Sequence, residues 1–268
     1  MARSSRHWYV YGASGQLEEA HSLGIKEARQ KKAFISPTTV IQEVRATPFH
    51  LMRWQRQQLV NACIDSPPRP NEPLAEYYER VNEMSFRRSD EATYFGKKIH
   101  TIAEHYPAQQ LDPALESWYI YIRDWFDTHV SQDLAQEERI ADTDIGVAGT
   151  LDRRIVTLTR GELAIVDFKT QGIKDRIYYG DSWPKQLSFY ANATRKKWAL
   201  PCNPKCINVV IDSTAPNPCI TKEWSDEEIN DAYRDFLSET WLWSRDNRHW
   251  PCGLWDLSHV LQSKHLCP

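Results

Sequence analysis

The stretch VDFKT, residues 166–170, places an acidic and a basic side chain at the end of an apolar run that begins at Leu163. A short apolar run bounded by polar turn residues is typical of a buried strand. Charged groups at the end of such a strand need partners, because an unpaired charge is costly to bury. The function therefore depends on which groups lie near Asp167 and Lys169.

The preceding residues supply a partner strand. Residues 146–170 are rich in β-forming residues and contain TRGE, a turn signal between two strands. If residues 160–161 form the centre of the turn, antiparallel pairing places Asp152 opposite Lys169 and diagonal to Asp167. Strand alternation then puts all three side chains on one face. Two carboxylates whose backbones lie roughly 7 Å apart can share one divalent cation, since Mg²⁺–oxygen bonds are about 2.1 Å long.

This arrangement has a chemical purpose. Two converging carboxylates repel each other, and a divalent cation relieves the repulsion. The cation polarises a phosphate oxygen and lowers the pKa of a bound water, while a neighbouring lysine neutralises charge that develops on phosphorus. The plainer alternative is a surface salt-bridge cluster, which is an unusual ending for an apolar strand. The residues alone thus predict a metal-dependent phosphodiesterase. The expected metal is Mg²⁺ or Mn²⁺.

Four short patterns occur in order along the chain. They are G-x-x-x-H at 96–100, GTLD at 149–152, VDFKT at 166–170 and Q-x-x-x-Y at 186–190. Together they resemble the PD-(D/E)xK nuclease superfamily in its RecB-like branch. With SPTTVI and RWQRQ added, the sequence is most similar to the mitochondrial genome maintenance exonucleases and to phage exonucleases, over about residues 36–245.

The resemblance implies a role for each matching residue. The implied catalytic residues are Asp152, Asp167, Lys169, Gln186 and Tyr190, and the implied metal ligands are His100, Asp152, Asp167 and the backbone carbonyl of Phe168. The i,i+4 spacing of the glutamine and the tyrosine puts both on one helix face, from which they would position the DNA or the lysine.

Neighbouring residues leave alternatives open. Outside the motif, His100 would be an ordinary core or surface histidine. Glu104, one helical turn later, would orient His100 or would form a plain surface pair with it. Glu137 or Glu138 would add an outer carboxylate.

Basic residues concentrate around the motifs. Residues 145–200 hold ten Lys/Arg and five Asp/Glu, whereas the whole chain has a net charge of -3. This pattern is expected for a local polyanion site, although a solvated basic face gives the same count. The candidate DNA contacts are Thr150, Arg153, Thr170, Lys185, Arg53 and Trp54. Ordinary strand propensity would also explain the threonines, and helix packing would explain the tryptophan.

Local signals predict where helices begin and end. Ser36 followed by Pro37 begins one helix, and Ser225 with Glu228 forms a capping box for another. Further helices are expected at 47–63, 74–84, 91–106, 113–129 and 182–198, and a strand at 206–212.

The predicted fold class is α/β, with a PD-(D/E)xK restriction-endonuclease-like core in which helices flank a central mixed sheet, preceded by an N-terminal helical part. The predicted divisions are a polar extension at 1–35, a nuclease domain at 36–250 and a tail at 251–268, with a helical part at 36–135 and a catalytic core at 136–250.

Composition limits the cofactors and the cellular setting. Six scattered cysteines lack the spacing of a zinc or iron–sulfur site, so we expect reduced thiols and no iron–sulfur cluster. There is no run of about 18 apolar residues and no secretory signal. We therefore predict a protein of the cytoplasm, or of the host cytoplasm if viral, with a mitochondrial location as the alternative. We also expect a monomer.

The predicted function is that of a DNA exonuclease in replication, recombination or repair, acting on single-stranded DNA or DNA ends. The exonuclease activity and the single-stranded substrate are what the resemblance implies. One alternative is a site-specific or structure-specific endonuclease of the same fold. Another is a non-catalytic DNA-binding module, which would not need the complete set of two aspartates and a lysine.

Overall fold

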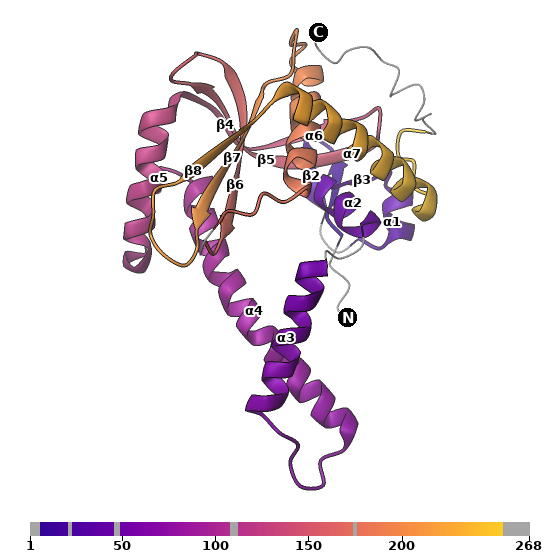
Figure 1. Ribbon diagram of the computed structural model, residues 1–268. Coiled ribbons are helices and arrows are strands. Elements are labelled where there is room, and N and C mark those ends of the chain that lie inside the picture. The colour runs from indigo at the N-terminus through magenta and orange to yellow at the C-terminus, as the bar shows by residue number, and fades with distance from the viewer. Residues whose placement is uncertain (1–5, 21–22, 46–48, 108–111, 174–175, 254–268) are drawn as a thin grey trace.

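A mixed sheet organises the protein (Figure 1). The computed structural model describes residues 6–20, 23–45, 49–107, 112–173 and 176–253, without the side chains of 49–51 and 87–93. The strands are β1 (Trp8–Tyr11), β2 (Leu17–Ala20), β3 (Phe34–Ile35), β4 (Val130–Asp142), β5 (Val147–Thr157), β6 (Leu163–Gln171), β7 (Lys205–Asp212) and β8 (Ile220–Trp224). The helices are α1 (Ile25–Gln30), α2 (Pro37–Val44), α3 (Phe49–Asp65), α4 (Leu74–Glu104), α5 (Glu116–His129), α6 (Ser182–Lys197) and α7 (Asp226–Asn247), with a short 3₁₀ turn at Pro113–Leu115.

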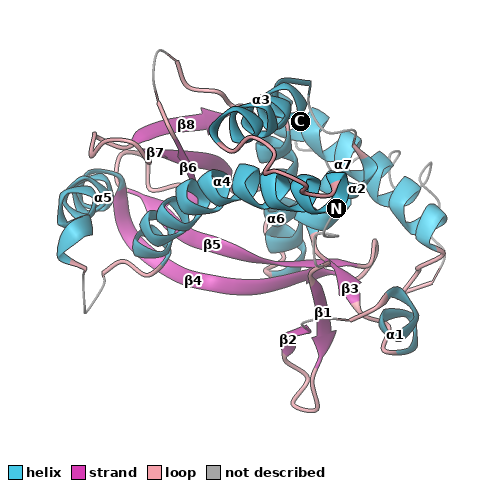
Figure 2. Ribbon diagram, turned by 90° about the horizontal axis from the view of Figure 1, so that it is seen from below, coloured by secondary structure: helices cyan, strands magenta, loops and turns pink. Residues whose placement is uncertain are grey.

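The strand order is β2-β1-β3-β5-β6-β7-β8, and β4 pairs with β5 beside this path. The β3·β5 and β6·β7 pairs are parallel, and the other pairs are antiparallel. Helices cover the sheet on both sides (Figure 2). The prediction of an α/β fold with a central mixed sheet flanked by helices is therefore confirmed.

Alternating side chains of β6 separate two cores. Val166 and Phe168 pack with Ile99 of α4 and Trp125 of α5. Ile165, on the opposite face, belongs to the core formed with α6 and α7. Because successive side chains of a strand point to opposite faces, Asp167 and Lys169 share the α6 face with Ile165. The strand that carries the VDFKT motif is thus buried on both sides, as its continuous apolar run predicts.

The predicted starts of two helices are confirmed. The Ser36 side chain accepts from the backbone N–H of Thr39, and the capping box of α7 is formed. However, α4 runs without interruption from Leu74 to Glu104, and the predicted break between residues 84 and 91 is wrong. That segment contains neither proline nor glycine, so its backbone hydrogen bonds continue although its apolar periodicity fades. The hairpin of α3 and the first half of α4, here called the arm, stands out from the body (Figure 1).

The N-terminal residues join the sheet rather than forming a polar extension. The strands β1 and β2 form a hairpin, and β1 also pairs with β3. Trp8 is fully buried, with edge-to-face contacts to Trp243 and His249. These strands have four residues or fewer, which is too short for a clear periodic signal.

The other predicted divisions also differ from the elements. The 135/136 boundary falls inside β4, a strand that the sequence analysis missed. Most of the predicted tail, from residue 254 onward, lies outside the described residues, and how the chain divides into domains stays a prediction. Among the described helices, none has the length and apolar character needed to cross a bilayer.

Candidate active site

The site lies at a fork in the sheet. The β5·β6 ladder ends at the pair Arg153↔Val166, after which β6 continues beside β7 while β5 continues beside β4. Asp152 and Asp167 are the first residues past this last pair. Phe168, next along β6, donates its backbone N–H to Asp152 Oδ2 at 2.8 Å. The carboxylate thus satisfies a backbone donor at the place where the two strands separate.

The register of the β5·β6 pair differs by two residues from the prediction. The paired residue numbers sum to 319 instead of 321, because Leu158–Gly161 form a four-residue loop closed by Thr157 and Glu162. Gly161 has a φ of 66° and occupies the last loop position rather than the centre. An even shift preserves the faces, so Asp152 and Asp167 still share one face, now directly opposite rather than diagonal.

A lysine and a glutamine complete the contacts of Asp167. Lys169 Nζ lies 2.9 Å from Asp167 Oδ1 and 2.8 Å from Oδ2. The same ammonium donates to Gln186 Oε1 of α6 at 3.0 Å. Tyr190, one turn further, is buried and hydrogen-bonded to Gln186, and burial raises the pKa of its hydroxyl well above its ordinary value. Gly149 makes room for this tyrosine, because a Cβ there would lie 2.9 Å from the ring and its hydroxyl.

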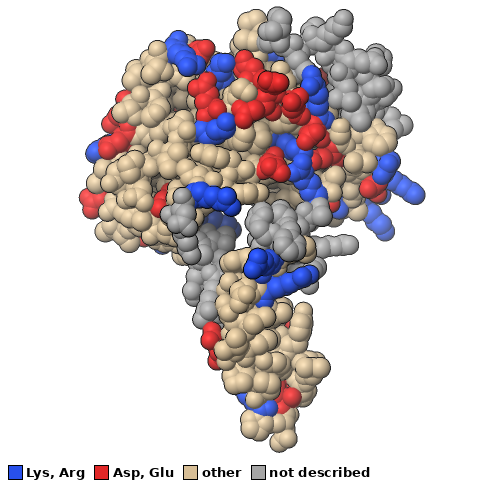
Figure 3. All heavy atoms as spheres, in the orientation of Figure 1, with Lys and Arg blue, Asp and Glu red and all other residues tan. Residues whose placement is uncertain are grey.

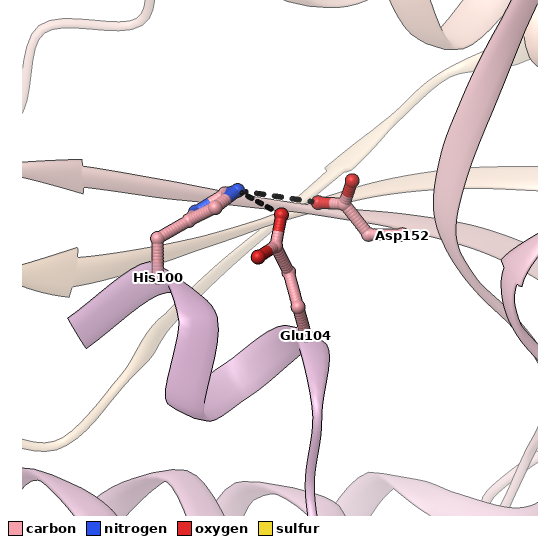
Figure 4. A group of neighbouring side chains, drawn as sticks. All are labelled: His100, Glu104 and Asp152. Carbon is pink, nitrogen blue, oxygen red and sulfur yellow. Dashed lines mark ion pairs between the residues drawn. The ribbon is translucent and has the colours of Figure 1, made fainter. Parts of the chain in front are cut away.

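The end of α4 brings a histidine and a carboxylate to the same place. Gly96 allows the approach, because a Cβ there would lie 3.2 Å from Thr170 Oγ1 of β6. One turn later, His100 Nε2 lies 3.0 Å from Glu104 Oε1 and 3.9 Å from Asp152 Oδ2 (Figure 4). The ligand atoms of these three side chains lie within 4.8 Å of one another.

Charge repulsion marks the site as one that suits a cation. Burial and then repulsion from Asp167 raise the pKa of Asp152 to about 8. Burial lowers the pKa of His100, but its hydrogen bond to Glu104 and the charge of Asp152 outweigh burial, so the net shift is upward. Oxygen donors with one imidazole suit Mg²⁺ or Mn²⁺, so the residues present fit the implied metal.

Glu137 adds a further carboxylate beside this group. Its position in β4 falls opposite Asp152, between the pairs Gln136↔Arg153 and Glu138↔Leu151. Its backbone has a φ of 48°, and its Oε1 is buried without a hydrogen-bond partner. Burial and the charge of Glu104 raise its pKa to about 7. Of the two glutamates considered from the sequence, this one lies near the site, whereas Glu138 is paired with Arg154 and Lys197.

We expect Asp152 to make the metal-free protein less stable as the pH rises. An ordinary aspartate has a pKa of about 3.9, whereas the pKa of Asp152 in the folded protein is about 8. The protonated side chain therefore contributes its full stabilisation below about pH 4, and this contribution is lost as the pH rises toward 8. Between pH 5 and 8, the free energy of unfolding should fall by up to about 1.4 kcal/mol per pH unit relative to Asp152→Asn. Urea unfolding in EDTA at several pH values measures this difference. Parallel pH profiles of the two proteins would contradict it.

Two predicted DNA contacts are buried in ion pairs instead. Arg153 is 1% exposed, pairs with Asp133 and donates to backbone carbonyls at the end of α4. Lys185 is 3% exposed and lies 2.5 Å from Glu239 Oε1 of α7. Both cations therefore link elements inside the protein and are not available to a phosphate, which corrects the prediction.

The remaining predicted contacts differ in accessibility. Thr150 is half-buried and its hydroxyl meets that of Tyr9 at 3.2 Å. Thr170 is half-buried beside α4. Arg53 and Trp54 are exposed on α3, with Trp54 43% exposed, so part of this tryptophan is open to solvent.

One residue of the site was missed. Asn208 of β7 is fully buried beside Asp167 and donates to its carboxylate at 2.6 Å. A single polar residue inside the apolar strand CINVVID was the signal that could have found it.

Two aspartates at a sheet fork, with a lysine two residues after the second, define a class of metal-dependent nucleases built on an α/β core. The comparison with protein families agrees: the model of the PD-(D/E)XK nuclease superfamily matches residues 51–229, well over half of the chain. The chain therefore belongs to the PD-(D/E)XK nuclease superfamily. A search of curated proteins found no match.

Proposed function

We propose that this protein is a metal-dependent DNA exonuclease of the RecB-like branch, related to the mitochondrial genome maintenance exonucleases and phage exonucleases. The observation that carries the proposal is the meeting of six side chains from α4, β5, β6 and α6. They are His100, Asp152, Asp167, Lys169, Gln186 and Tyr190. The proposed enzyme acts as a monomer.

Each residue has a task in phosphodiester hydrolysis. Asp152, Asp167 and His100 would hold Mg²⁺ or Mn²⁺, together with the backbone carbonyl of Phe168. When bound, the cation would polarise a phosphate oxygen and would lower the pKa of a water molecule at the site. Lys169 would neutralise charge that develops on the phosphate, and Gln186 keeps its ammonium in place through the 3.0 Å hydrogen bond.

The arm supports a single-stranded substrate. The same helix, α4, forms one side of the arm and carries His100 into the site. The exposed segment RWQRQ of α3 offers Arg53 and Arg56 to phosphates and Trp54 to an unstacked base. Figure 3 shows basic side chains on the part of the arm nearest the body. A strand whose bases are free to stack would use both kinds of contact.

The proposed setting is DNA replication, recombination or repair in the cytoplasm, or in the host cytoplasm if the protein is encoded by a phage. This part of the proposal rests on the resemblance of the motifs to those of exonucleases with such roles.

We expect end-labelled linear single-stranded DNA to be degraded in MgCl₂ or MnCl₂ and to survive in EDTA. Matched duplex should be degraded at least about tenfold more slowly, because each stacked base contributes about 1–3 kcal/mol to binding a single strand. Gel electrophoresis of samples taken over time distinguishes the outcomes. Discrete internal fragments would indicate an endonuclease, and tight binding without cleavage would indicate a non-catalytic module.

A further inference from the structure

Asn208 is a fully buried polar side chain in an otherwise apolar strand, and it lies beside a candidate metal ligand. In the parallel β6·β7 ladder it is the register partner of Asp167. Its side-chain Nδ2 donates to Asp167 Oδ2 at 2.6 Å and to the backbone carbonyl of Asp167 at 3.1 Å. We propose that Asn208, held by Trp224, is a positioning residue that selects which oxygen of Asp167 faces the metal.

Trp224 fixes the orientation of the amide. Its indole Nε1 donates to Asn208 Oδ1 at 2.7 Å. An indole N–H can only donate, so the partner atom must be the amide oxygen. The amide NH₂ group therefore faces Asp167, and a rotated amide would place two donors against each other. This assignment follows from the chemistry of the three groups.

The nitrogens around Asp167 distinguish its two oxygens. Oδ2 accepts a hydrogen bond from Asn208 at 2.6 Å and also lies 2.8 Å from Lys169 Nζ. Oδ1 accepts the hydrogen bond of Lys169 at 2.9 Å and has no other close nitrogen among the contacts described. Oδ1 is therefore the less crowded oxygen and the one with more room for a cation.

The tryptophan is itself held in place. Trp224 is 9% exposed, Lys222 Nζ lies 4.5 Å from the centre of its ring, and Tyr179 meets it edge-on at 6.4 Å. Tyr179 belongs to the segment that leads into α6. A rigid tryptophan gives the amide one orientation, and second-layer contacts of this kind set the geometry of metal ligands.

The inference rests on the proposed function, because it requires Asp167 to be a metal ligand. Its test uses the affinity for MnCl₂, measured by isothermal titration calorimetry, with no cleavage assay. Asn208→Leu should weaken the affinity roughly 10–100-fold, the usual cost of losing a second-layer partner. Trp224→Phe keeps the amide but frees its orientation, and should weaken the affinity about fivefold, the equivalent of one hydrogen bond of about 1 kcal/mol.

The double variant separates positioning from ordinary packing. If Trp224 acts through Asn208, then Trp224→Phe should cause no further loss of affinity in the Asn208→Leu background. Trp243→Phe is the matched control: this buried tryptophan also loses a 2.9 Å indole hydrogen bond, to Glu43, but it has no contact with Asn208 among the interactions described. Its affinity for MnCl₂ should equal that of the wild type.

Indole N–H resonances give a second readout that needs only folded protein. The Trp224 signal, assigned by its absence from the spectrum of Trp224→Phe, should shift when MgCl₂ is added to the wild type, whereas the Trp243 signal should not. A stationary Trp224 signal, or additive losses of affinity in the double variant, would overturn the proposal. If Asp167→Asn binds MnCl₂ as tightly as the wild type, the metal site of the proposed function fails. If Asp167→Asn binds MnCl₂ more weakly but Asn208→Leu binds it as tightly as the wild type, the metal site stands and the positioning role fails.

Discussion

Lys169→Met should reduce DNA cleavage on the order of a thousandfold while leaving metal binding intact or slightly tighter. The ammonium lies within 3.0 Å of Asp167 and Gln186, and no residue nearby in the described site can replace its charge. Methionine has a similar length and is compatible with the half-buried position, so the loss should come from chemistry rather than unfolding. Removing a cation beside Asp167 also removes repulsion toward a metal ion, which predicts the unchanged or tighter metal affinity. Cleavage rates at saturating MgCl₂, together with calorimetric titration of MnCl₂, measure both effects.

Lys205→Met is the control for this experiment. Lys205 also lies in the sheet and pairs with a carboxylate, Asp226, and its side chain is 28% exposed compared with 21% for Lys169. The control should cleave DNA like the wild type. An active Lys169→Met protein would remove the lysine from the mechanism, and a parallel loss of metal affinity would show that it supports the site rather than the reaction.

The parts of the site that follow from local periodicity could be predicted from the sequence. Strand alternation placed Asp152, Asp167 and Lys169 on one face, and this result survived a register error because the error was an even number. The i,i+4 spacing placed Gln186 and Tyr190 on one side of α6. The same alternation also puts Arg153 on the face opposite to its neighbour Asp152, so the rule already argued against this arginine as a phosphate contact.

The parts that depend on tertiary contacts could not be predicted in this way. The closeness of His100 to Asp152 requires α4 to pack across β6 at Gly96, which no local pattern specifies. The contact between Asn208 and Asp167 depends on the parallel pairing of two strands whose sequences are separated by a whole helix. The burial of Lys185 depends on Glu239 of α7, 54 residues away. In each case the partner lies far along the chain.

A closed circle of single-stranded DNA should resist degradation under conditions that consume a linear strand of the same sequence. The helix α4 belongs both to the arm and to the site. We propose that a strand bound by the exposed basic and aromatic residues of α3 reaches His100 through a passage beside the arm. A strand that enters such a passage end-first needs a free end, and a circle has none. Time courses in MgCl₂ at equal DNA concentration compare the two substrates.

The control is the same circle opened once at a single position, which restores a free end without changing sequence or length. Digestion should then begin at the rate of the linear strand. Added salt should slow the digestion of the opened circle steeply at subsaturating DNA, because each phosphate contact releases condensed counterions. Arg53→Gln should lower the digestion rate and make that rate less sensitive to salt, since this exposed arginine is one of the proposed phosphate contacts. Equal digestion of the closed and opened circles would rule out entry from an end and would favour an endonuclease that closes around an internal segment.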